Sequence, residues 1–145
     1  IILVDVDSYE KFDAFELMNS EKLYFVTAFD SFSLKKGIEI IGTMRQKVKM
    51  KKILFSREYV EEDDEYLNLL SLTYPIEWDE EKIHFPYDQG DLTAIIENQR
   101  VTKIKLKNLS EEYRMSLFMM VQEIAPEVKV GEIKKAFKNI KKENK

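Results

Sequence analysis

The chain has 145 residues, of which 44% are hydrophobic and 34% are charged, and its formal net charge is -4. This length is enough for one hydrophobic core and too short for two. The sequence has no cysteine, which excludes disulfides, thiolate metal sites and a cysteine nucleophile, and favours a cytoplasmic protein by default. No apolar run approaches the roughly 20 residues of a membrane span.

The first segment is an unbroken aliphatic run, Ile1 to Val4, followed directly by Asp5. A strand that is apolar at every position is typical of parallel sheets, in which both faces are covered and strands lie on either side. This run begins without any lead-in, so we expect the chain to be a piece of a longer protein. Chemistry that involves Asp5 would then extend upstream of residue 1.

Strand-like runs alternate with helical patterns along the rest of the chain, at a spacing typical of βα units. The predicted strands are Ile1 to Val6, Leu23 to Ala28, Ile53 to Phe55 and Lys82 to Phe85. Five helices are predicted, and the first runs from Tyr9 to Asn19. The second is capped by Asp30, Ser31 or Ser33 and has Leu34, Ile38, Ile41 and Val48 on its apolar face, and the third starts in the acidic run Glu61 to Glu65 and buries Tyr66, Leu69 and Leu70. The fourth is short and contains Leu92, Ile95 and Ile96, and the fifth is capped by Asn108 or Ser110 and ended by Pro126. The pattern predicts a single three-layer α/β domain over residues 1–126, with a mostly parallel sheet flanked by helices.

The C-terminal segment, residues 127–145, is strongly basic. Residues 129–145 contain seven lysines and two glutamates, with Ile133, Phe137 and Ile140 at helical spacing. The pattern predicts a basic amphipathic helix. Packing on the domain or solvation explains it best, peripheral binding to an anionic membrane comes second, and contact with DNA comes third.

Polar residues that follow strands are the candidate site residues, because parallel sheets bind ligands at the carboxyl ends of their strands. These residues are Asp5 with Asp7, Asp30, Ser56 with Arg57, and Asp88. Each one alone is better explained as the point where a buried strand emerges into solvent. Only the whole set indicates a site.

Several stretches resemble, in order, the second half of the ParA and MinD family of deviant P-loop ATPases. They are Ile1 to Asp5, Leu23 to Leu34, Lys52 to Arg57, Phe85-Pro86-Tyr87-Asp88 and Glu97 to Arg100. The resemblance covers residue 1 to about residue 125. It implies a P-loop-NTPase-like part domain of an ATPase that positions cellular machinery such as a plasmid, a septum or a pilus.

The resemblance also implies roles for individual residues. Asp5 would lie near the magnesium ion and the attacking water of a bound ATP, as the catalytic and indirect metal residue. The base side of the nucleotide pocket would be lined by Ser56, Arg57, Pro86, Tyr87 and Asp88. Implied partners are other proteins and a second copy in a homodimer, and the basic tail would be a peripheral membrane contact.

The chain departs from the family in three ways. The Gly-rich lysine loop that cradles phosphates is absent from these 145 residues, so this chain alone is not expected to hydrolyse ATP. Asp5 lacks the proline and glycine that often follow the aspartate. Ser56 stands where the family usually has an asparagine, so one hydroxyl replaces the paired donor and acceptor of an amide. The nucleotide pocket is therefore either altered or degenerate.

A second family also resembles the opening of the chain. Leu3 to Asp7, followed by Thr27 to Asp30, is similar to the start of a response-regulator receiver domain. The aspartate that accepts phosphate there is absent after Leu54-Phe55, where Ser56 stands. The alternative is therefore a non-catalytic interaction domain of the pseudo-receiver type. His84, the only histidine, has no zinc-ligand partners in the sequence and is expected to be a packed or rim residue.

Overall fold

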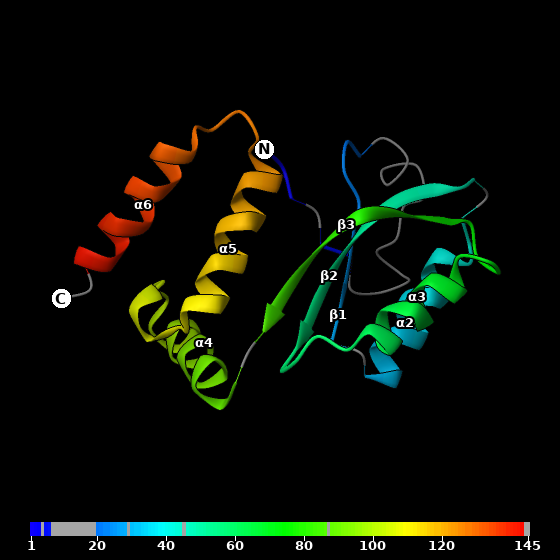
Figure 1. The fold of residues 1–145 in the computed structure, drawn as a ribbon, viewed down its shortest axis with the longest axis horizontal. Helices are drawn as coiled ribbons and strands as arrows, with labels where there is room; N and C mark the ends of the chain where they lie inside the picture. The colour runs from blue at the N-terminus through cyan, green and yellow to red at the C-terminus, as the bar shows by residue number, and fades with distance from the viewer. Residues whose placement is uncertain (4, 7–19, 29, 45, 87, 144–145) are drawn as a thin grey trace. The chain divides into compact units, whose positions relative to one another are not determined.

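The computed structural model describes residues 1–3, 5–6, 20–28, 30–44, 46–86 and 88–143 (Figure 1). These residues form two compact units. Unit 1 comprises Ile1–Phe55 and Tyr59–Lys82, and unit 2 comprises Ser56–Glu58 and Ile83–Lys145. The predicted helix from Tyr9 to Asn19 lies outside the described residues, as does Asp7.

The elements follow one another as strands and helices and then as helices alone. They are β1 (Tyr24–Thr27), α2 (Ser31–Ile41), β2 (Val48–Ser56), α3 (Glu61–Leu70), β3 (Ile76–Pro86), α4 (Gln89–Val101), the 3-10 turn η2 (Leu106–Asn108), α5 (Glu111–Ile124) and α6 (Val130–Glu143). The fold is therefore α/β, as predicted, with a small parallel sheet flanked by helices.

The sheet has three strands in the order β1-β2-β3, and β1 pairs with β2 in parallel, with Val26 opposite Ile53. Two right-handed crossovers that step in the same direction place their helices on the same face of a sheet. Accordingly, α2 and α3 both pack against the same face of the sheet in unit 1 (Figure 1).

The core of unit 1 fills the space between that face and the two helices. The strands contribute Phe25, Val48, Met50, Leu54 and Ile76, and the helices contribute Leu34, Ile38, Ile41 and Leu67. The core residues of β2, Val48, Met50 and Leu54, are separated by even numbers of positions, as expected for one face of a strand, and Lys51, Lys52 and Ile53 between them are also buried. Gly37 allows α2 to approach the sheet closely, because a Cβ there would lie 2.8 Å from the Phe25 ring.

The other face of β2 and β3 in unit 1 is charged. Three ion pairs join the two strands: Lys47 to Glu77 (3.4 Å), Lys49 to Asp79 (3.8 Å) and Lys51 to Glu81 (3.1 Å). Partners are 30 residues apart in every pair, a constant offset that parallel strands require. Most of these side chains are well exposed, so each pair contributes less than about 1 kcal/mol.

The predicted strand at Ile1 to Val6 is wrong for the described residues of that stretch. Ile1, Ile2 and Leu3 belong to no strand and are 80%, 90% and 71% exposed. A fully apolar strand is stable only where neighbours satisfy its backbone and cover both faces. No described strand pairs with these residues.

The predicted strand at Leu23 to Ala28 is confirmed in position as β1, but it is not buried on both faces. Phe25 and Thr27 are buried, whereas Val26 is 61% exposed. The strand at Ile53 to Phe55 is also confirmed, and it begins five residues earlier than predicted. Val48 was assigned to the apolar face of the preceding helix, but α2 ends at Ile41 and Val48 starts β2.

The buried face predicted for α3 is right for Leu70, which packs against the core, and wrong for the other two residues. Tyr66 and Leu69 are exposed, and the side chains that face the sheet are Asp64 and Leu67. Trp78 belongs to β3, and its indole N-H donates to the Leu67 carbonyl oxygen at 2.8 Å. The acidic start of α3 therefore contains one buried carboxylate among exposed ones.

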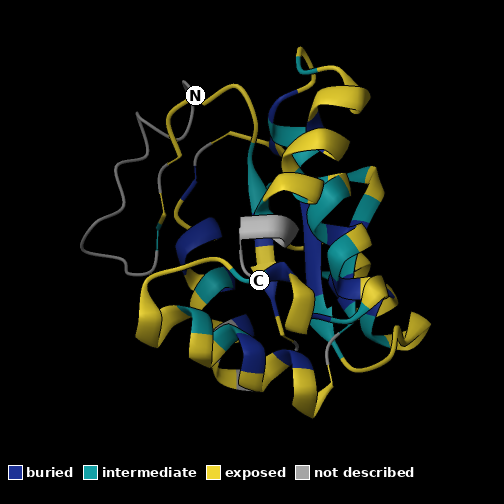
Figure 2. Cartoon of the chain, turned by 90° about the vertical axis from the view of Figure 1, so that its left-hand side faces the viewer, coloured by how far each residue is buried: buried dark blue, intermediate teal, exposed yellow. Residues whose placement is uncertain are grey.

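Unit 2 is built from the last residues of β3 and three helices with buried and exposed sides (Figure 2). Phe85 packs edge-on against Tyr113 of α5, with ring centroids 5.2 Å apart. The predicted cap of α5 is confirmed, since the Ser110 hydroxyl accepts from the Tyr113 N-H. Asp91 is buried and accepts from the Ser110 N-H and hydroxyl, which ties α4 to the start of α5.

The basic C-terminal helix is α6, and its apolar side packs within unit 2. Ile133 is 3% exposed, and Phe137 meets Phe118 of α5 edge-on, with centroids 5.9 Å apart. This packing confirms the first explanation given for the basic segment 127–145, which was packing on the domain or solvation. Lys134, Lys135 and Lys138 of this helix are exposed.

Candidate functional site

The ends of β2 and β3 in unit 2 form an open depression of about 440 Å³. It is lined by Arg57, which follows β2, by Asp88, which follows β3, and by Gln89 and Leu92 of α4. All four side chains are exposed, and Leu92 supplies the apolar part of the lining. Together with Ser56 and His84, these residues are called the strand-end site below.

Asp88 is fixed in this site because it caps α4. Its Oδ1 accepts from the N-H groups of Gly90 and Asp91 at 2.7 and 2.9 Å. An aspartate at the N-cap satisfies orphan amides and complements the helix dipole. Asp88 Oδ2 makes neither bond, so half of the carboxylate keeps its accepting capacity.

Ser56 is held by two neighbours in unit 2. Its hydroxyl donates to the Glu58 carbonyl oxygen at 2.6 Å, and its Oγ lies 2.8 Å from His84 Nε2. The His84 carbonyl oxygen in turn accepts from the Ser116 hydroxyl at 2.6 Å. Burial lowers the pKa of His84 below its usual value, while a hydrogen bond with the backbone of Ser56 opposes the shift. The imidazole is therefore neutral at pH 7.

Of the site residues predicted from the sequence, the structure places two, Arg57 and Asp88, around one depression. Ser56, Arg57 and Asp88 lie in unit 2 at the ends of successive strands, and Pro86 is the last residue of β3. Tyr87 lies outside the described residues. Asp5 belongs to unit 1, where it is exposed and forms part of no helix or strand.

His84 is the functional candidate that the sequence interpretation left outside the site. It is half-buried, as expected for a packed or rim residue, but its imidazole contacts the hydroxyl of Ser56. Alternation along β3 was the available signal, because His84 and Pro86 are two residues apart and therefore lie on the same face of the strand.

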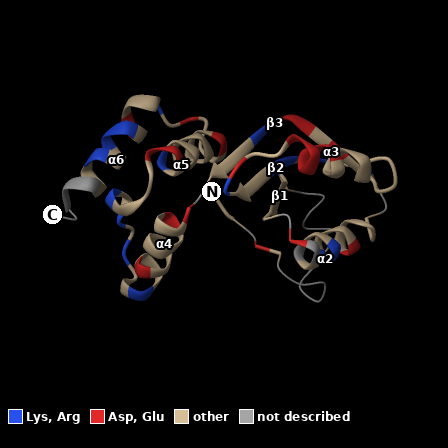
Figure 3. Cartoon of the chain, turned by 60° about the horizontal axis from the view of Figure 1, so that its bottom comes forward, with Lys and Arg blue, Asp and Glu red and all other residues tan. Residues whose placement is uncertain are grey.

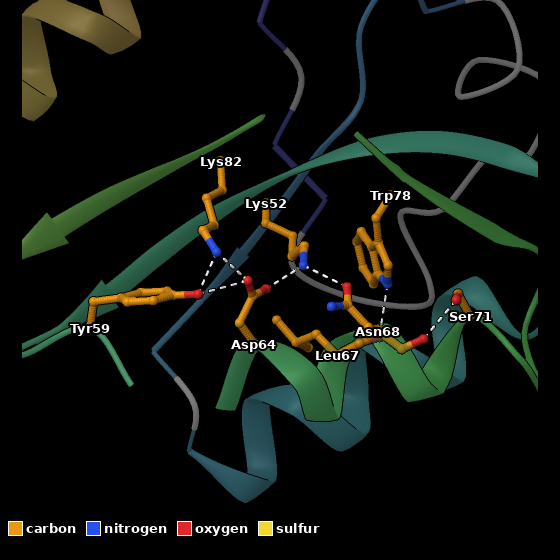
Figure 4. A network of polar contacts seen from close by, with 8 residues as sticks. All are labelled: Lys52, Tyr59, Asp64, Leu67, Asn68, Ser71, Trp78 and Lys82. Carbon is orange, nitrogen blue, oxygen red and sulfur yellow. Dashed lines mark hydrogen bonds and ion pairs between the residues drawn. The ribbon is translucent and has the colours of Figure 1, made fainter. Parts of the chain in front are cut away.

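Unit 1 contains a second polar cluster, the Asp64 network, made of Lys52, Tyr59, Asp64, Asn68 and Lys82 (Figure 4). Lys52 donates to Asp64 Oδ1 and to Asn68 Oδ1, the latter at 2.8 Å. Asp64 Oδ2 accepts from Lys82 and from the Tyr59 hydroxyl, the latter at 2.9 Å. The network joins the first turns of α3 to two strands.

Charge and burial compete at Asp64. Burial alone would raise the pKa of its carboxyl, but hydrogen bonds from Lys52, Lys82 and Tyr59 outweigh that effect and hold the pKa below its usual value. For Lys82, burial alone would lower the pKa, but hydrogen bonds with Asp64 and Tyr59 raise it. Asp64 and Lys82 therefore stabilise each other's charged form.

The described part of the chain offers no metal centre. Within it, no group of three or more Asp, Glu or His side chains lies close enough to hold a metal ion. No buried side-chain nitrogen or oxygen in this part lacks a hydrogen-bond partner. The Asp64 network is therefore a closed ion cluster, whereas the strand-end site has exposed polar groups.

The two units carry charge of opposite sign. Unit 1 contains 17 acidic and 10 basic side chains, and unit 2 contains 10 acidic and 13 basic ones. Figure 3 shows acidic residues at the start of α3 and basic residues along α6. None of the helices formed by the described residues has both the length and the apolar character needed to cross a membrane.

Comparison of the chain with protein-family models, with curated proteins and with solved structures finds no match.

Proposed function

We propose that the strand-end site binds the base side of a nucleotide, and that the chain is the C-terminal part of a ParA/MinD-like ATPase that positions cellular machinery. The observation that carries this proposal is the shared lining of one depression by Arg57 and Asp88. Both belong to stretches that resemble the family's nucleotide pocket, and each follows a different strand. Ligands of parallel sheets bind at such strand ends.

The residues of the site fit a heterocyclic base. Leu92 offers an apolar contact, and the planar guanidinium of Arg57 can stack on a ring or donate to its nitrogens. The free oxygen of Asp88 and the hydroxyl of Ser56 can accept from ring or amino N-H groups. ATP would be held here through its base.

The residues described do not fit a magnesium ion. Asp5 is a single exposed carboxylate with no metal-ligand group around it among the described residues. We derive no hydrolytic step through the ion, and Asp5 keeps its proposed role only in a parent protein that supplies a phosphate-binding loop. Such a parent would also complete the proposed three-layer, P-loop-NTPase-like domain.

The proposal extends to partners. Homodimerisation and binding of other proteins belong to it by resemblance, with a cytoplasmic setting. Peripheral membrane contact would use the exposed lysines of α6, since its Ile133 is buried within unit 2. Insertion of an apolar helix face into a bilayer is therefore not part of the proposal.

The test is ligand-detected NMR binding of ATP to the 145-residue chain and to Arg57→Ala. We expect binding by the wild type and a loss of affinity of about 5-fold or more in the variant, the size of a lost charged contact. Arg100→Ala removes the same charge near the other end of α4 and should bind like the wild type. Equal binding by both variants would place ATP away from Arg57, and absence of binding by the wild type would support a non-catalytic interaction domain instead.

A further inference from the structure

Helix α3 in unit 1 exposes an apolar stripe bordered by acidic residues. Tyr66, Leu69 and Leu72 follow one another at intervals of three residues and are 49%, 60% and 81% exposed. Leu72 comes just after α3, and its N-H donates to the Leu69 carbonyl oxygen at 3.1 Å, so it continues the helical turn. Glu62 and Glu65 are exposed and lie one turn before Tyr66 and Leu69. These five residues are called the α3 face below.

Unit 2 exposes an isoleucine among basic residues, in the segment that follows α4. Ile104 is 67% exposed. From residue 98 to residue 110 the chain has no acidic residue and four basic ones, which are Arg100, Lys103, Lys105 and Lys107. Residues 100–107 are called the basic turn below.

The backbone of the basic turn is held in place although one of its residues is strained. Thr102 is left-handed, with φ 50° and ψ 34°, a conformation that a β-branched residue rarely adopts. The Asn98 side chain closes the turn, since its Oδ1 accepts from the Lys105 N-H at 3.0 Å and its amide donates to the Lys105 carbonyl oxygen at 3.4 Å. Strained residues that the surrounding structure holds are concentrated at binding sites. The turn therefore presents Ile104 from a fixed backbone.

We propose that the α3 face of one chain binds the basic turn of a second copy of the chain. Both surfaces combine exposed apolar side chains with charge, and their charges are opposite. Burial of Ile104 against Leu69 supplies affinity, and the lysines and glutamates around them select this pairing of surfaces. The contact needs no nucleotide and does not involve the strand-end site, so it goes beyond the proposed function.

The distribution of charge favours a second copy as the partner. With 17 acidic and 10 basic side chains unit 1 has a net charge of -7, and with 10 acidic and 13 basic ones unit 2 has +3. Two α3 faces repel each other, and so do two basic turns. Unit 1 of one chain and unit 2 of another attract, and this attraction raises the rate of the productive encounter.

Sedimentation equilibrium of the 145-residue chain without nucleotide measures the contact, from micromolar to near-millimolar concentration. We expect the average mass to rise with concentration, and to rise less at high salt because the charges are screened. Leu69→Ser and Ile104→Ser each truncate an exposed side chain, so both variants should fold, and each should weaken self-association about 10-fold or more. The control Met115→Ser truncates a 57% exposed side chain of α5 and should assemble like the wild type.

A mixture of the two variants identifies which surfaces meet. The Leu69→Ser chain keeps an intact basic turn, and the Ile104→Ser chain keeps an intact α3 face. One unaltered contact can therefore form between them, whether the wild type closes as a two-fold dimer or continues as a chain of copies. We expect the equimolar mixture to form a one-to-one complex at concentrations at which each variant alone is monomeric.

Three results would overturn the inference: a wild type that stays monomeric at every concentration, assembly that neither variant weakens, or a mixture that associates no more than its components. If the monomeric wild type instead bound vesicles of an anionic phospholipid and Ile104→Ser did not, the partner of the basic turn would be a lipid surface. None of these results affects binding of ATP at the strand-end site, which is measured separately.

Discussion

The Asp64 network and the strand-end site are both polar clusters beside β2, and they differ in how much hydrogen-bonding capacity remains unused. In the network, both carboxylate oxygens of Asp64 accept from cations, and Lys52 also reaches Asn68. In the strand-end site, Arg57 and Asp88 are exposed and line an open depression. A cluster whose capacity is used internally stabilises the fold, whereas one with capacity to spare can bind a ligand.

Burial explains why the two clusters differ in unused hydrogen-bonding capacity. The side chains of Lys52 and Asp64 are only 5% and 8% exposed, so any unpaired charge there would lack solvation. The strand-end residues lie where the strands leave the sheet, and water can form the hydrogen bonds that the protein does not provide there. We therefore expect substitutions in the network to change stability, and substitutions in the strand-end site to change binding.

The largest expected effect is that of Asp64→Asn. The substitution leaves Lys52 and Lys82 without a counter-ion, and breaking a buried pair in this way costs about 3 to 5 kcal/mol. Urea unfolding measures the loss. Asp63→Asn removes the same charge one position earlier and should cost less than about 1 kcal/mol. A loss for Asp64→Asn as small as that of the control would contradict the role given to the network.

Acid should weaken unit 1 for the same reason. The pKa of Asp64 is lower in the folded chain than in the unfolded chain, so its contribution is complete above about pH 4 and is lost as the pH falls through the lower folded value. Asp64→Asn cannot titrate at this position and should show a weaker pH dependence there. A parallel pH dependence of the two proteins would count against this linkage.

Lys82→Met should have a smaller effect than Asp64→Asn. Asp64 keeps Lys52 and Tyr59 as partners, and the Lys82 side chain is 35% exposed, so solvent screens part of the interaction. We expect a loss of about 1 kcal/mol in the free energy of unfolding. A loss as large as that of Asp64→Asn would mean that Lys82, and not Lys52, contributes most of the stabilisation of the Asp64 network.

His84 should make unit 2 sensitive to mild acid. Its pKa is lower when folded than when unfolded, so its contribution is complete above about pH 6.5 and declines as the pH falls through the folded value. His84→Gln keeps a donor but does not titrate. Hydrogen exchange of the amides of α4 and α5 at pH 7.5 and pH 5 should show a smaller change in this variant than in the wild type.

The smallest effect is expected for the charged face of the sheet. Glu77→Gln removes one exposed ion pair with Lys47, whose side chains are 64% and 56% exposed for lysine and glutamate. The cost should be below about 0.5 kcal/mol and should vanish in high salt. A cost above 1 kcal/mol would show that the row of pairs acts as a unit.

The sequence predicted which polar residues follow the ends of β2 and β3 better than it predicted where these strands begin. Ser56, Arg57 and Asp88 were selected because polar residues after parallel strands meet at one edge, and this rule needs no exact strand boundaries. The starts of β2 and β3 were missed although charged and apolar residues alternate there with a period of two, because the prediction took only continuous apolar runs as strands.

The Asp64 network could not be predicted, for a physical reason. Five consecutive acidic residues at a helix start are explained by the helix dipole, and nothing local marks the fourth as buried. Its burial depends on Lys52 and Lys82, which come from two strands distant in sequence.

The apolar run Ile1 to Leu3 led to the wrong prediction of a buried strand. Hydrophobicity alone does not supply a strand with neighbouring strands to pair with.

The most direct test of the central claim is a map of amide shifts on adding ATP to the 145-residue chain. The account predicts concentration-dependent shifts at Arg57, Gln89, Gly90 and Leu92, around the depression, and none at Asp64 and Asn68. Shifts confined to the Asp64 network, or no shifts at all, would contradict the assignment of binding to the strand-end site.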